Sequence, residues 1–333
     1  MSHVVNHADP LQQLRTLYLP IQHELAACEE RLQLELQSQY PYVDQLVKHG
    51  FRIGGKRLRP ALLLLAAKCV GDISNDHIVL AAVMEMIHTA TLVHDDVLDE
   101  AGMRRHLDTV NSIWGNETSI LLGDFLFSHA FFLSSTLDDT YACRQIGRST
   151  TVVCSGELRQ IESRGRFDLS EDVYLAIINA KTAELCACCC QLGVRFAGGS
   201  EKDTKNLEAF GRDLGISFQI SDDILDLVGQ EETAGKSLGT DLEKQKLTLP
   251  LIHLLRESGE KERAEIISRL NTPEAKSPTE LIQWLHNANS LKYSQEKAKE
   301  YAEQACDRLT QLPRSEARLT LEQMTEFVIN RQH

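Results

Sequence analysis

Proline is missing from the middle of the chain. The 333-residue sequence has eight prolines, and none of them lies between residues 61 and 249. Proline breaks a helix because it has no backbone N–H and clashes with the preceding turn, so this gap favours long helices. Alternation of apolar and polar residues with a period of two, which would indicate β-strands, is also missing throughout. These two absences predict an all-α fold.

Positive charge is scarce as well. The chain has 35 Lys and Arg residues against 48 Asp and Glu residues, a formal net charge of -13 at pH 7. This balance argues against nucleic acid or an anionic membrane as the main partner. The first ten residues lack the basic and apolar regions of a signal peptide, and no apolar run approaches the roughly 20 residues that span a bilayer. We therefore expect a cytoplasmic protein that is not an integral membrane protein.

Cysteine spacing typical of zinc sites is absent. Nine cysteines include the run CACCC at residues 186–190, and the others are scattered along the chain. Neither arrangement has the paired spacing of a zinc site. We expect these cysteines to be reduced, small residues of the core.

Two segments with helical periodicity each lead into a cluster of aspartates. Apolar residues recur every three or four positions in residues 80–91 and again in residues 207–218. The first segment leads into LVHDDVLDE, residues 92–100, and the second into QISDDILDL, residues 219–227. On a helix, the outer two aspartates of each DDxxD share one face and the middle one lies beside them. The two clusters are Asp95, Asp96 and Asp99, and Asp222, Asp223 and Asp226.

Crowded carboxylates repel one another unless a cation lies between them. One acidic cluster on a helix is more often a solvated face, but two clusters on facing helices of a bundle can point six carboxylates into one cavity. Mg2+ prefers oxygen ligands and is usually completed by substrate phosphates. The pair of clusters therefore predicts a site for several Mg2+ ions and a polyanion such as diphosphate.

The segment GGKRLRP, residues 54–60, supplies basic residues. It places Lys56, Arg57 and Arg59 beside a flexible pair of glycines, and MRR adds Arg104 and Arg105 directly after the first aspartate cluster. The guanidinium fork matches phosphate oxygens with paired hydrogen bonds. Together with the aspartates, these residues predict a site for two diphosphates, one held through metal and one through Arg and Lys.

The order of these motifs resembles that of the trans-polyprenyl diphosphate synthases. GGKRLRP, DDVLD and MRR are followed by KTAEL at residues 181–185, FQISDD at 218–223 and DLEKQKLTLP at 241–250. The resemblance implies a single-domain helical bundle of the isoprenoid synthase type over residues 1–333, with a central active-site cavity and an N-terminal helical extension over residues 1–40. It also implies a Mg2+-dependent prenyltransferase, usually a homodimer, that joins isopentenyl diphosphate to an allylic diphosphate head to tail.

The resemblance assigns roles to individual residues. The direct metal ligands it implies are Asp95, Asp99 and Asp222, with Asp96, Asp223 and Asp226 as ligands or directly behind them. The residues implied for the allylic diphosphate are Lys181, Lys236 and Arg104, with Lys246 as a further substrate-binding residue. The residues implied for isopentenyl diphosphate are Gly55, Lys56, Arg59, His88 and Arg105. Lys181, Thr182 and Gln219 are the catalytic residues: Lys181 stabilises the leaving diphosphate, and the other two direct oxygen dipoles toward the allylic cation. The alternative for His88 is a core histidine on an apolar helix.

The helix before the first cluster bears on product length. Ala90 lies five residues before Asp95, about 7.5 Å along a helix axis. In the family a bulky aromatic side chain near this position closes the tunnel, whereas Ala90 and Thr91 are small, and Met86 is a candidate floor farther down. We expect a long product of about C40, as from an octaprenyl diphosphate synthase, with a geranylgeranyl or farnesyl diphosphate synthase as the alternative. Because the product is apolar, a loose association of the protein with a membrane, for release of the product, is kept as an alternative.

Two positions depart from the family pattern. After MRR the family usually has GKPT, where this chain has His106, Leu107, Asp108 and Thr109. Before the second lysine of its last motif the family often has glycine, where this chain has Gln245. Neither departure removes a metal ligand or a phosphate-binding residue that the resemblance implies.

Three other classes of protein are weaker alternatives. The segment GQEETAGKS, residues 229–237, misses the spacing of a P-loop by one residue and follows no strand pattern. A class I terpene cyclase also carries DDxxD on a helical bundle, but its second metal motif resembles NSE. A non-catalytic subunit of a heteromeric synthase would lose ligands that this chain keeps.

Overall fold

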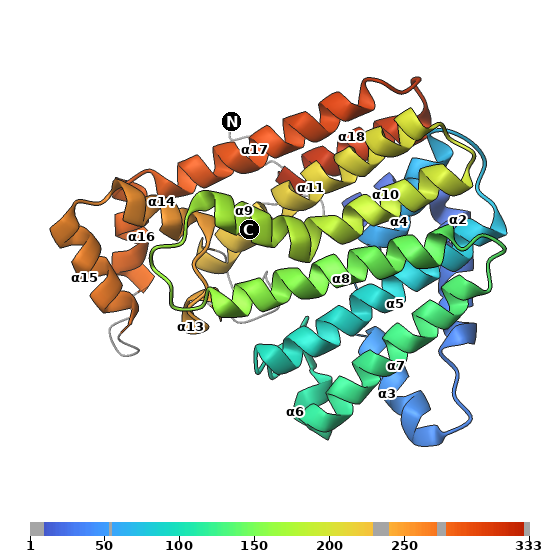
Figure 1. Ribbon diagram of the computed structural model, residues 1–333, viewed down its shortest axis with the longest axis horizontal. Helices are drawn as coiled ribbons and strands as arrows, with labels where there is room; N and C mark the ends of the chain where they lie inside the picture. Colours follow the sequence, from blue (N-terminus) through green and yellow to red (C-terminus); the bar gives the residue numbers. More distant parts are fainter. Residues whose placement is uncertain (1–9, 53–54, 229–239, 272–277, 330–333) are drawn as a thin grey trace, which may run out of the picture.

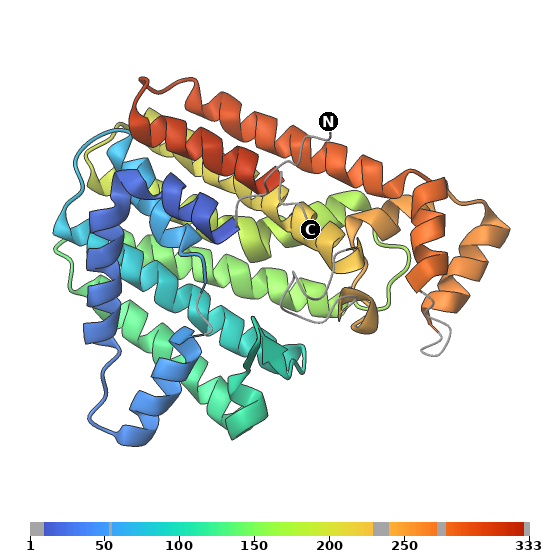
Figure 2. The same ribbon diagram turned by 180° about the vertical axis from the view of Figure 1, so that it is seen from behind.

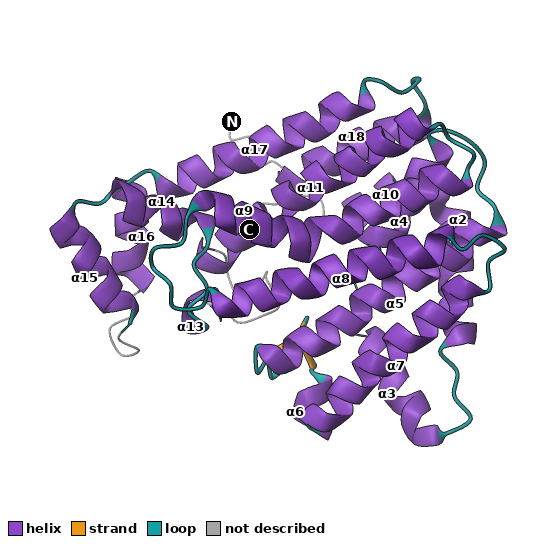
Figure 3. Cartoon of the chain, viewed as in Figure 1, coloured by secondary structure: helices purple, strands orange, loops and turns teal. Residues whose placement is uncertain are grey.

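Helices form almost all of the regular structure of the protein (Figures 1 and 3). The computed structural model describes residues 10–52, 55–228, 240–271 and 278–329. Within these residues the strands are β1 (Met103–Arg104) and β2 (Leu107–Asp108), which pair as one antiparallel hairpin. The all-α prediction is confirmed.

The helices follow one another with short connections. Those before the first aspartate helix are α1 (Pro10–Leu17), a 3-10 turn (Leu19–Ile21), α2 (Gln22–Glu35), α3 (Pro41–Arg52) and α4 (Leu58–Lys68). The central ones are α5 (Asn75–Leu98), α6 (Val110–Trp114), α7 (Asn116–Ser135), α8 (Tyr141–Glu162), α9 (Glu171–Ile178), a π-helical turn (Asn179–Ala183), α10 (Glu184–Phe196) and α11 (Glu201–Val228). The last ones are α13 (Thr240–Glu243), α14 (Leu249–Glu257), α15 (Glu260–Leu270), α16 (Pro278–Asn287), α17 (Ser290–Leu309) and α18 (Glu316–Ile329). The proline-free region holds α5, α8 and α11, of 24, 22 and 28 residues, as its composition predicted.

Helix α11 belongs to two hydrophobic cores. Its first half contributes Leu207, Phe210 and Leu214 to a core shared with α4, α5 and α10, and its second half contributes Ile220 and Ile224 to a core shared with α14 and α17. Figure 1 shows α11 running lengthwise between α10 and α17. One helix is therefore shared by both cores, and the single domain stays a prediction.

The N-terminal helices cross the bundle. Seen from behind, α2 lies across the ends of the long helices (Figure 2), and it packs on α5. Its residues Cys28 and Leu32 are buried in the first core. The helical part of the predicted N-terminal extension therefore contributes to the main core.

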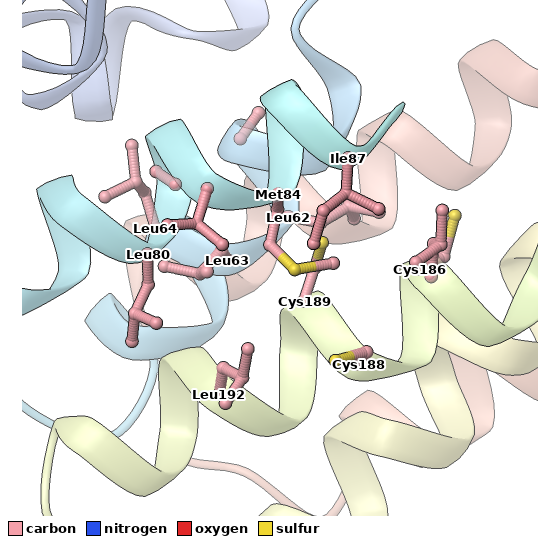
Figure 4. Close-up of a cluster of buried hydrophobic side chains, with 14 of the residues drawn as sticks. Leu62, Leu63, Leu64, Leu80, Met84, Ile87, Cys186, Cys188, Cys189 and Leu192 are labelled. Carbon is pink, nitrogen blue, oxygen red and sulfur yellow. The ribbon is translucent and has the colours of Figure 1, made fainter. Parts of the chain in front are cut away.

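The CACCC run lies in the first core. Figure 4 shows Cys189 of α10 directed toward Leu62 and Met84 of the neighbouring helices, with Cys186 and Cys188 on the same helix. The four cysteines of the run, together with the two at positions 28 and 69, are buried, and all nine thiols are free. The prediction of small, reduced core cysteines is confirmed for these six. It is wrong for the exposed cysteine at position 154, because α8 turns that face to solvent.

Among the residues that the structure describes, three helical stretches are long and apolar enough, by length and composition, to cross a membrane: α5, α7 and the continuous stretch Glu171–Phe196. The expectation that no segment reaches this length and apolarity is therefore wrong. In α5 and Glu171–Phe196, 72% and 67% of the most apolar window is buried inside the protein, whereas in α7 only 39% is buried. A helix that is apolar all round is buried in a core, which accounts for the first two but not for α7.

The two predicted aspartate helices are confirmed as α5 and α11. Helix α5 ends at Leu98, and Asp99 follows it with its backbone N–H still donating to the carbonyl oxygen of Asp95 at 2.8 Å. Figures 1 and 2 show the C-terminal ends of α5, α8 and α11 at the same end of the bundle, near α13. The fold thus brings together two motifs that lie more than 100 residues apart in sequence.

Both departures from the family pattern fall where the backbone is left-handed. In the two-residue turn between β1 and β2, Arg105 has a φ of 51° and His106 a φ of 62°. Positive φ at both positions is typical of a type I′ turn, which favours glycine at the second of them. Gln245 has a φ of 54°. The chain therefore keeps the backbone that glycine favours while replacing glycine itself.

Restoring glycine in this turn is expected to stabilise the fold. A residue with a Cβ in the left-handed region destabilises the fold by about 1–2 kcal/mol, and glycine removes this strain. Glycine also loses more conformational freedom on folding, which offsets about 0.5–1 kcal/mol of the stabilisation. His106→Gly is therefore expected to raise the free energy of unfolding by about 0.5–1 kcal/mol, measured by urea titration. His106→Ala, which keeps the Cβ, is the control. A glycine variant no more stable than the alanine variant would contradict this account.

Candidate active site

A cavity of about 270 Å³ opens at the end of the bundle where the two aspartate clusters meet. Its lining includes Asp99 from the end of α5, Asp222 and Asp223 from α11, and Lys181 from the π-helical turn. Further lining residues are Glu100, Ala101, Gly102, Met103, Arg104, Gln160, Ile178, Gln219, Asp241, Glu243, Lys244, Lys246 and Thr248. The cavity therefore combines carboxylates of both clusters with lysines from two other segments.

Lys181 lies between two carboxylates. Its Nζ atom is 3.8 Å from Asp95 Oδ2 and 2.5 Å from Oε2 of Glu157 on α8. Burial, together with the charges of Glu157 and Asp99, raises the pKa of Asp95 to about 6 against the lowering effect of Lys181. A further cation beside Asp95 would favour the ionised carboxylate.

The other aspartates of the first cluster also face cations. Asp96 is buried, and Arg104 Nε donates to its Oδ1 at 2.7 Å. Lys246 Nζ is 3.0 Å from Asp99 Oδ1, and Arg164 Nη2 is 3.5 Å from the same oxygen. Burial acts to raise the pKa of Asp99, but the charge and hydrogen bond of Lys246, together with the charges of Lys181 and Arg164, outweigh burial and lower the pKa. Asp96 thus forms an ion pair with an arginine, whereas Asp99 pairs with a lysine that also lines the cavity.

A hydrogen-bonded chain joins the second cluster to the π-helical turn. Thr182 Oγ1 donates to Gln219 Oε1 at 2.6 Å, and Gln219 Nε2 donates to Asp223 Oδ1 at 2.7 Å. The Tyr174 hydroxyl donates to Asp223 Oδ2 at 2.6 Å. Burial, followed by the charge of Asp241, raises the pKa of Asp223 to about 8. Both oxygens of Asp223 accept a hydrogen bond, and its Oδ1 fixes the orientation of the Gln219 amide.

Asp222 and Asp226 lie in different surroundings. Asp226 is buried and accepts a hydrogen bond from the backbone N–H of Asp241 at 3.1 Å, whereas Asp222 is half-buried and lines the cavity. In the part of the chain that the structure describes, no group of three or more His, Cys, Asp or Glu side chains is arranged to hold a metal ion. Mg2+ often takes one or two carboxylates and completes its shell with phosphate and water. The carboxylates of Asp95, Asp99 and Asp222 suit such ions.

Two glycines allow the π-helical turn to be approached from both sides. A Cβ on Gly156 of α8 would lie 2.9 Å from the backbone nitrogen of Lys181, and a Cβ on Gly215 of α11 would lie 2.5 Å from the Cα of Ala183. Any larger residue would push α8 or α11 away from the turn. Single π-helical turns often occur at functional sites, and this one carries Lys181 and Thr182.

The basic residues of GGKRLRP and MRR gather around His88, which is half-buried. Burial holds the pKa of His88 well below its ordinary value, and the charges of Arg59 and Arg105 lower it further, so its imidazole is neutral at pH 7. A Cβ on Gly55 would come within 2.5 Å of Arg105 Nη1, so glycine lets the guanidinium lie against this segment. Gly55, Lys56, Arg59, His88 and Arg105 lie outside the cavity lining, whereas Arg104 of MRR belongs to it.

The predicted chain-length residues lie on α5. Ala90 and Met86 are fully buried, and Thr91 is half-buried. Thr91 shares the face of Asp95, whereas Ala90 lies about 140° farther round the helix. Lys236 lies outside the described residues, as does the GQEETAGKS segment.

Four residues that contact predicted site residues were not expected from the sequence: Glu157, Arg164, Tyr174 and Asp241. The first three contact the predicted residues from α8, the loop after it, and α9. No recognised motif marks their segments, and only helix packing brings them to the site. Asp241 stands at the start of DLEKQKLTLP, so that motif could have indicated it.

Comparison with known proteins identifies the family of the chain. The family model for polyprenyl synthetase matches residues 40–287. The chain is 36% identical over 313 residues to the all-trans-nonaprenyl-diphosphate synthase (geranyl-diphosphate specific) of Rhodobacter capsulatus, covering 94% of this chain and 96% of that protein. It is 36% identical over 321 residues to the heptaprenyl diphosphate synthase component 2 of Geobacillus stearothermophilus, covering 96% and 99%. The crystal structure of the polyprenyl synthase from Caulobacter crescentus CB15, complexed with calcium and isoprenyl diphosphate, matches with a TM-score of 0.90 and 34% identity, covering 97% of this chain and 98% of that one. The chain therefore belongs to the polyprenyl synthetase family and is a prenyltransferase, a polyprenyl diphosphate synthase.

Proposed function

We propose that this chain condenses isopentenyl diphosphate repeatedly, head to tail, onto an allylic diphosphate to make a long-chain all-trans polyprenyl diphosphate. The observation that carries this proposal is the single cavity that Asp99 of the first cluster, Asp222 of the second and Lys181 line together. The names of the Rhodobacter and Geobacillus relatives, nonaprenyl and heptaprenyl, lie on either side of the product of about C40 expected from the small residues on α5.

The aspartates are proposed to hold Mg2+. Asp95, Asp99 and Asp222 would be direct ligands, and Asp96, Asp223 and Asp226 would orient them from behind. Bound Mg2+ supplies positive charge that stabilises the diphosphate as it leaves. The calcium and isoprenyl diphosphate in the Caulobacter relative support a divalent ion beside diphosphate.

The chain's own residues are proposed to bind the allylic diphosphate and protect the cation. Lys181 and Lys246, which now pair with Asp95 and Asp99, would bind the diphosphate together with Arg104 and Lys236. As the carbon–oxygen bond breaks, positive charge develops on the allylic carbon. Thr182 and Gln219 would stabilise it with their oxygen dipoles, because preorganised dipoles need not reorient during the reaction. The departed diphosphate would accept the proton that leaves after the new bond forms.

The basic group around His88 is proposed to bind isopentenyl diphosphate. Lys56, Arg59 and Arg105 carry the positive charge, and the glycine at position 55 gives Arg105 its place. The neutral imidazole of His88 can donate one N–H to a phosphate oxygen. This arrangement would hold the double bond of isopentenyl diphosphate while its partner is ionised in the neighbouring cavity.

A homodimer is proposed from the exposed face of α7. Leu121, Phe125 and Phe132 follow helical spacing on that face and are 67%, 39% and 62% exposed. A contiguous apolar surface of this kind marks an interaction site. A second copy would cover it, consistent with a cytoplasmic protein whose other two apolar stretches are buried. Sedimentation velocity is expected to give the mass of two chains for the wild type and of one chain for Leu121→Glu; a monomeric wild type at micromolar concentration would contradict the proposal.

A second candidate function follows from the Geobacillus relative, whose name makes it one component of a synthase. A chain of that kind acts with another subunit. If the purified chain forms no product alone but gains turnover when a second chain is added, this candidate replaces the homodimer.

Removing a proposed metal ligand is expected to stop the reaction. Asp95→Asn and Asp222→Asn should each lower turnover on the order of 100-fold or more, because each removes a carboxylate that holds charge against the leaving diphosphate. Incorporation of labelled isopentenyl diphosphate in Mg2+ measures this, and a chelator should have the same effect on the wild type. The control is Asp172→Asn on the exposed surface of α9. Turnover near that of the wild type in either cluster variant would disprove the metal site.

Filling the proposed tunnel is expected to shorten the product. The ring of Ala90→Tyr would occupy space about 7.5 Å from Asp95 along the axis, so that products shift toward C15 or C20 while the first condensation persists. Chromatographic sizing of the products measures this, and Ala90→Ser, which stays small, is the control. An unchanged product distribution would place the tail elsewhere, and a wild-type product at C20 would favour the geranylgeranyl alternative.

A further inference from the structure

Two carboxylates hold the guanidinium of Arg57, a basic residue of GGKRLRP. Its Nη1 donates to Oε1 of Glu85 on α5 at 2.7 Å, and its Nη2 donates to Oε2 of Glu29 on α2 at 3.2 Å. Its Nε also donates to Glu29 Oε1. All three guanidinium nitrogens are engaged, and they join α2, α4 and α5 at one point.

Glu85 is an unusual residue in this place. It is 1% exposed and lies on the apolar helix α5, three residues before His88 and therefore on the same side. One of its oxygens bonds to Arg57, and the other is buried without a hydrogen-bond partner in the described structure. A buried carboxylate is costly unless cations surround it. Arg57 bonds to it directly, and its charge also acts on Arg105.

The backbone at Arg57 is fixed as well. Arg57 is the residue before α4 and has a φ of 51°, in the left-handed region that disfavours side chains. Its carbonyl oxygen accepts from the backbone N–H of Ala61, and the carbonyl oxygen of the preceding Lys56 accepts from the Tyr18 hydroxyl at 2.9 Å. This strained residue lies between Lys56 and Arg59, so its position sets the positions of both.

We propose that Arg57 and Glu85 are positioning residues of the basic site and that Arg57 does not itself bind the diphosphate. In this assignment, which rests on the proposed function, Glu85 and Arg57 form a clamp that holds Lys56, Arg59 and Arg105 in the geometry that isopentenyl diphosphate needs. The clamp also places one negative charge among several positive ones, which reduces their mutual repulsion before the substrate enters.

The sign of one measurement separates this role from a purely electrostatic one. A buried negative charge near a diphosphate repels it. If Glu85 acted on the substrate only through its charge, Glu85→Gln would tighten diphosphate binding. If Glu85 positions Arg57 and through it the phosphate-binding residues, the same change would weaken binding, since the amide holds a guanidinium less firmly than a carboxylate does.

The experiment compares Glu85→Gln and Arg57→Lys with Glu30→Gln as the matched control, since Glu30 is an exposed glutamate on α2 beside Glu29. Glu85→Gln and Arg57→Lys are each expected to raise the KM for isopentenyl diphosphate about tenfold or more, because small displacements of binding groups weaken substrate binding strongly. The KM for the allylic diphosphate and kcat at saturation are expected to stay within about twofold of the wild type. The KM of the double variant for isopentenyl diphosphate is expected to lie within about twofold of that of the more impaired single variant, because either change alone breaks the clamp.

Calorimetric binding of inorganic pyrophosphate in the presence of a chelator provides a readout without turnover. With metal removed, pyrophosphate reports the basic site, and the same loss of affinity is expected there. Tighter or unchanged pyrophosphate binding in Glu85→Gln, or an equal rise in KM for both substrates, would overturn the proposal. Thermal denaturation verifies folding, and if Glu85→Gln fails to fold, Arg57→Lys decides by the same criteria. A wild type that binds pyrophosphate but condenses nothing would contradict the proposed function and leave the binding test of the clamp intact.

Discussion

The repulsion among six carboxylates at one end of the bundle is the constraint on which the rest of the site depends. Each aspartate of the first cluster faces a cation from a different part of the chain: Lys181 from the π-helical turn, Arg104 from the β1–β2 hairpin and Lys246 from the segment after α13. The second cluster is held differently, by hydrogen bonds from Tyr174, Gln219 and a backbone amide. Elements far apart in sequence are thus tied to the same few carboxylates, and the cavity forms between them.

Small residues allow this arrangement. A Cβ on Gly193 of α10 would lie 2.1 Å from the carbonyl oxygen of Leu63 in α4, and the cysteines of the same helix fill the remaining space beside α5 (Figure 4). The glycines at positions 156 and 215 do the same around the π-helical turn. Close packing transmits displacement because protein interiors have few voids. Close backbone contacts between the helices therefore fix the positions of the side chains at the site.

Local patterns in the sequence predicted what local physics determines. The proline gap and the apolar periodicity predicted α5 and α11, and the repeated DDxxD predicted that their ends meet. The sequence did not indicate the contact of Tyr174 with Asp223, 49 residues away, because a tyrosine on an apolar helix is ordinarily a core residue. It also did not indicate that Arg57 pairs with Glu29 and Glu85, since a run of basic residues looks equally suited to phosphate at every position.

The motif departures show a different limit. His106 and Gln245 depart from the family pattern, but both lie at left-handed backbone positions, where the shape of the turn persists without glycine. The exposed face of α7 was also hidden from the sequence, because apolar periodicity does not say whether a face meets the same chain or another one.

The membership of α11 in both hydrophobic cores has a consequence for how the molecule comes apart. If either core opens, α11 loses the packing of one of its halves, and a helix so deprived is marginal in water because its stability comes mostly from tertiary contacts. The two cores therefore cannot behave as independent folding units. If the core around α14 and α17 opened, the half of α11 that carries the second aspartate cluster would unfold. Unfolding and loss of the active site are therefore one cooperative event.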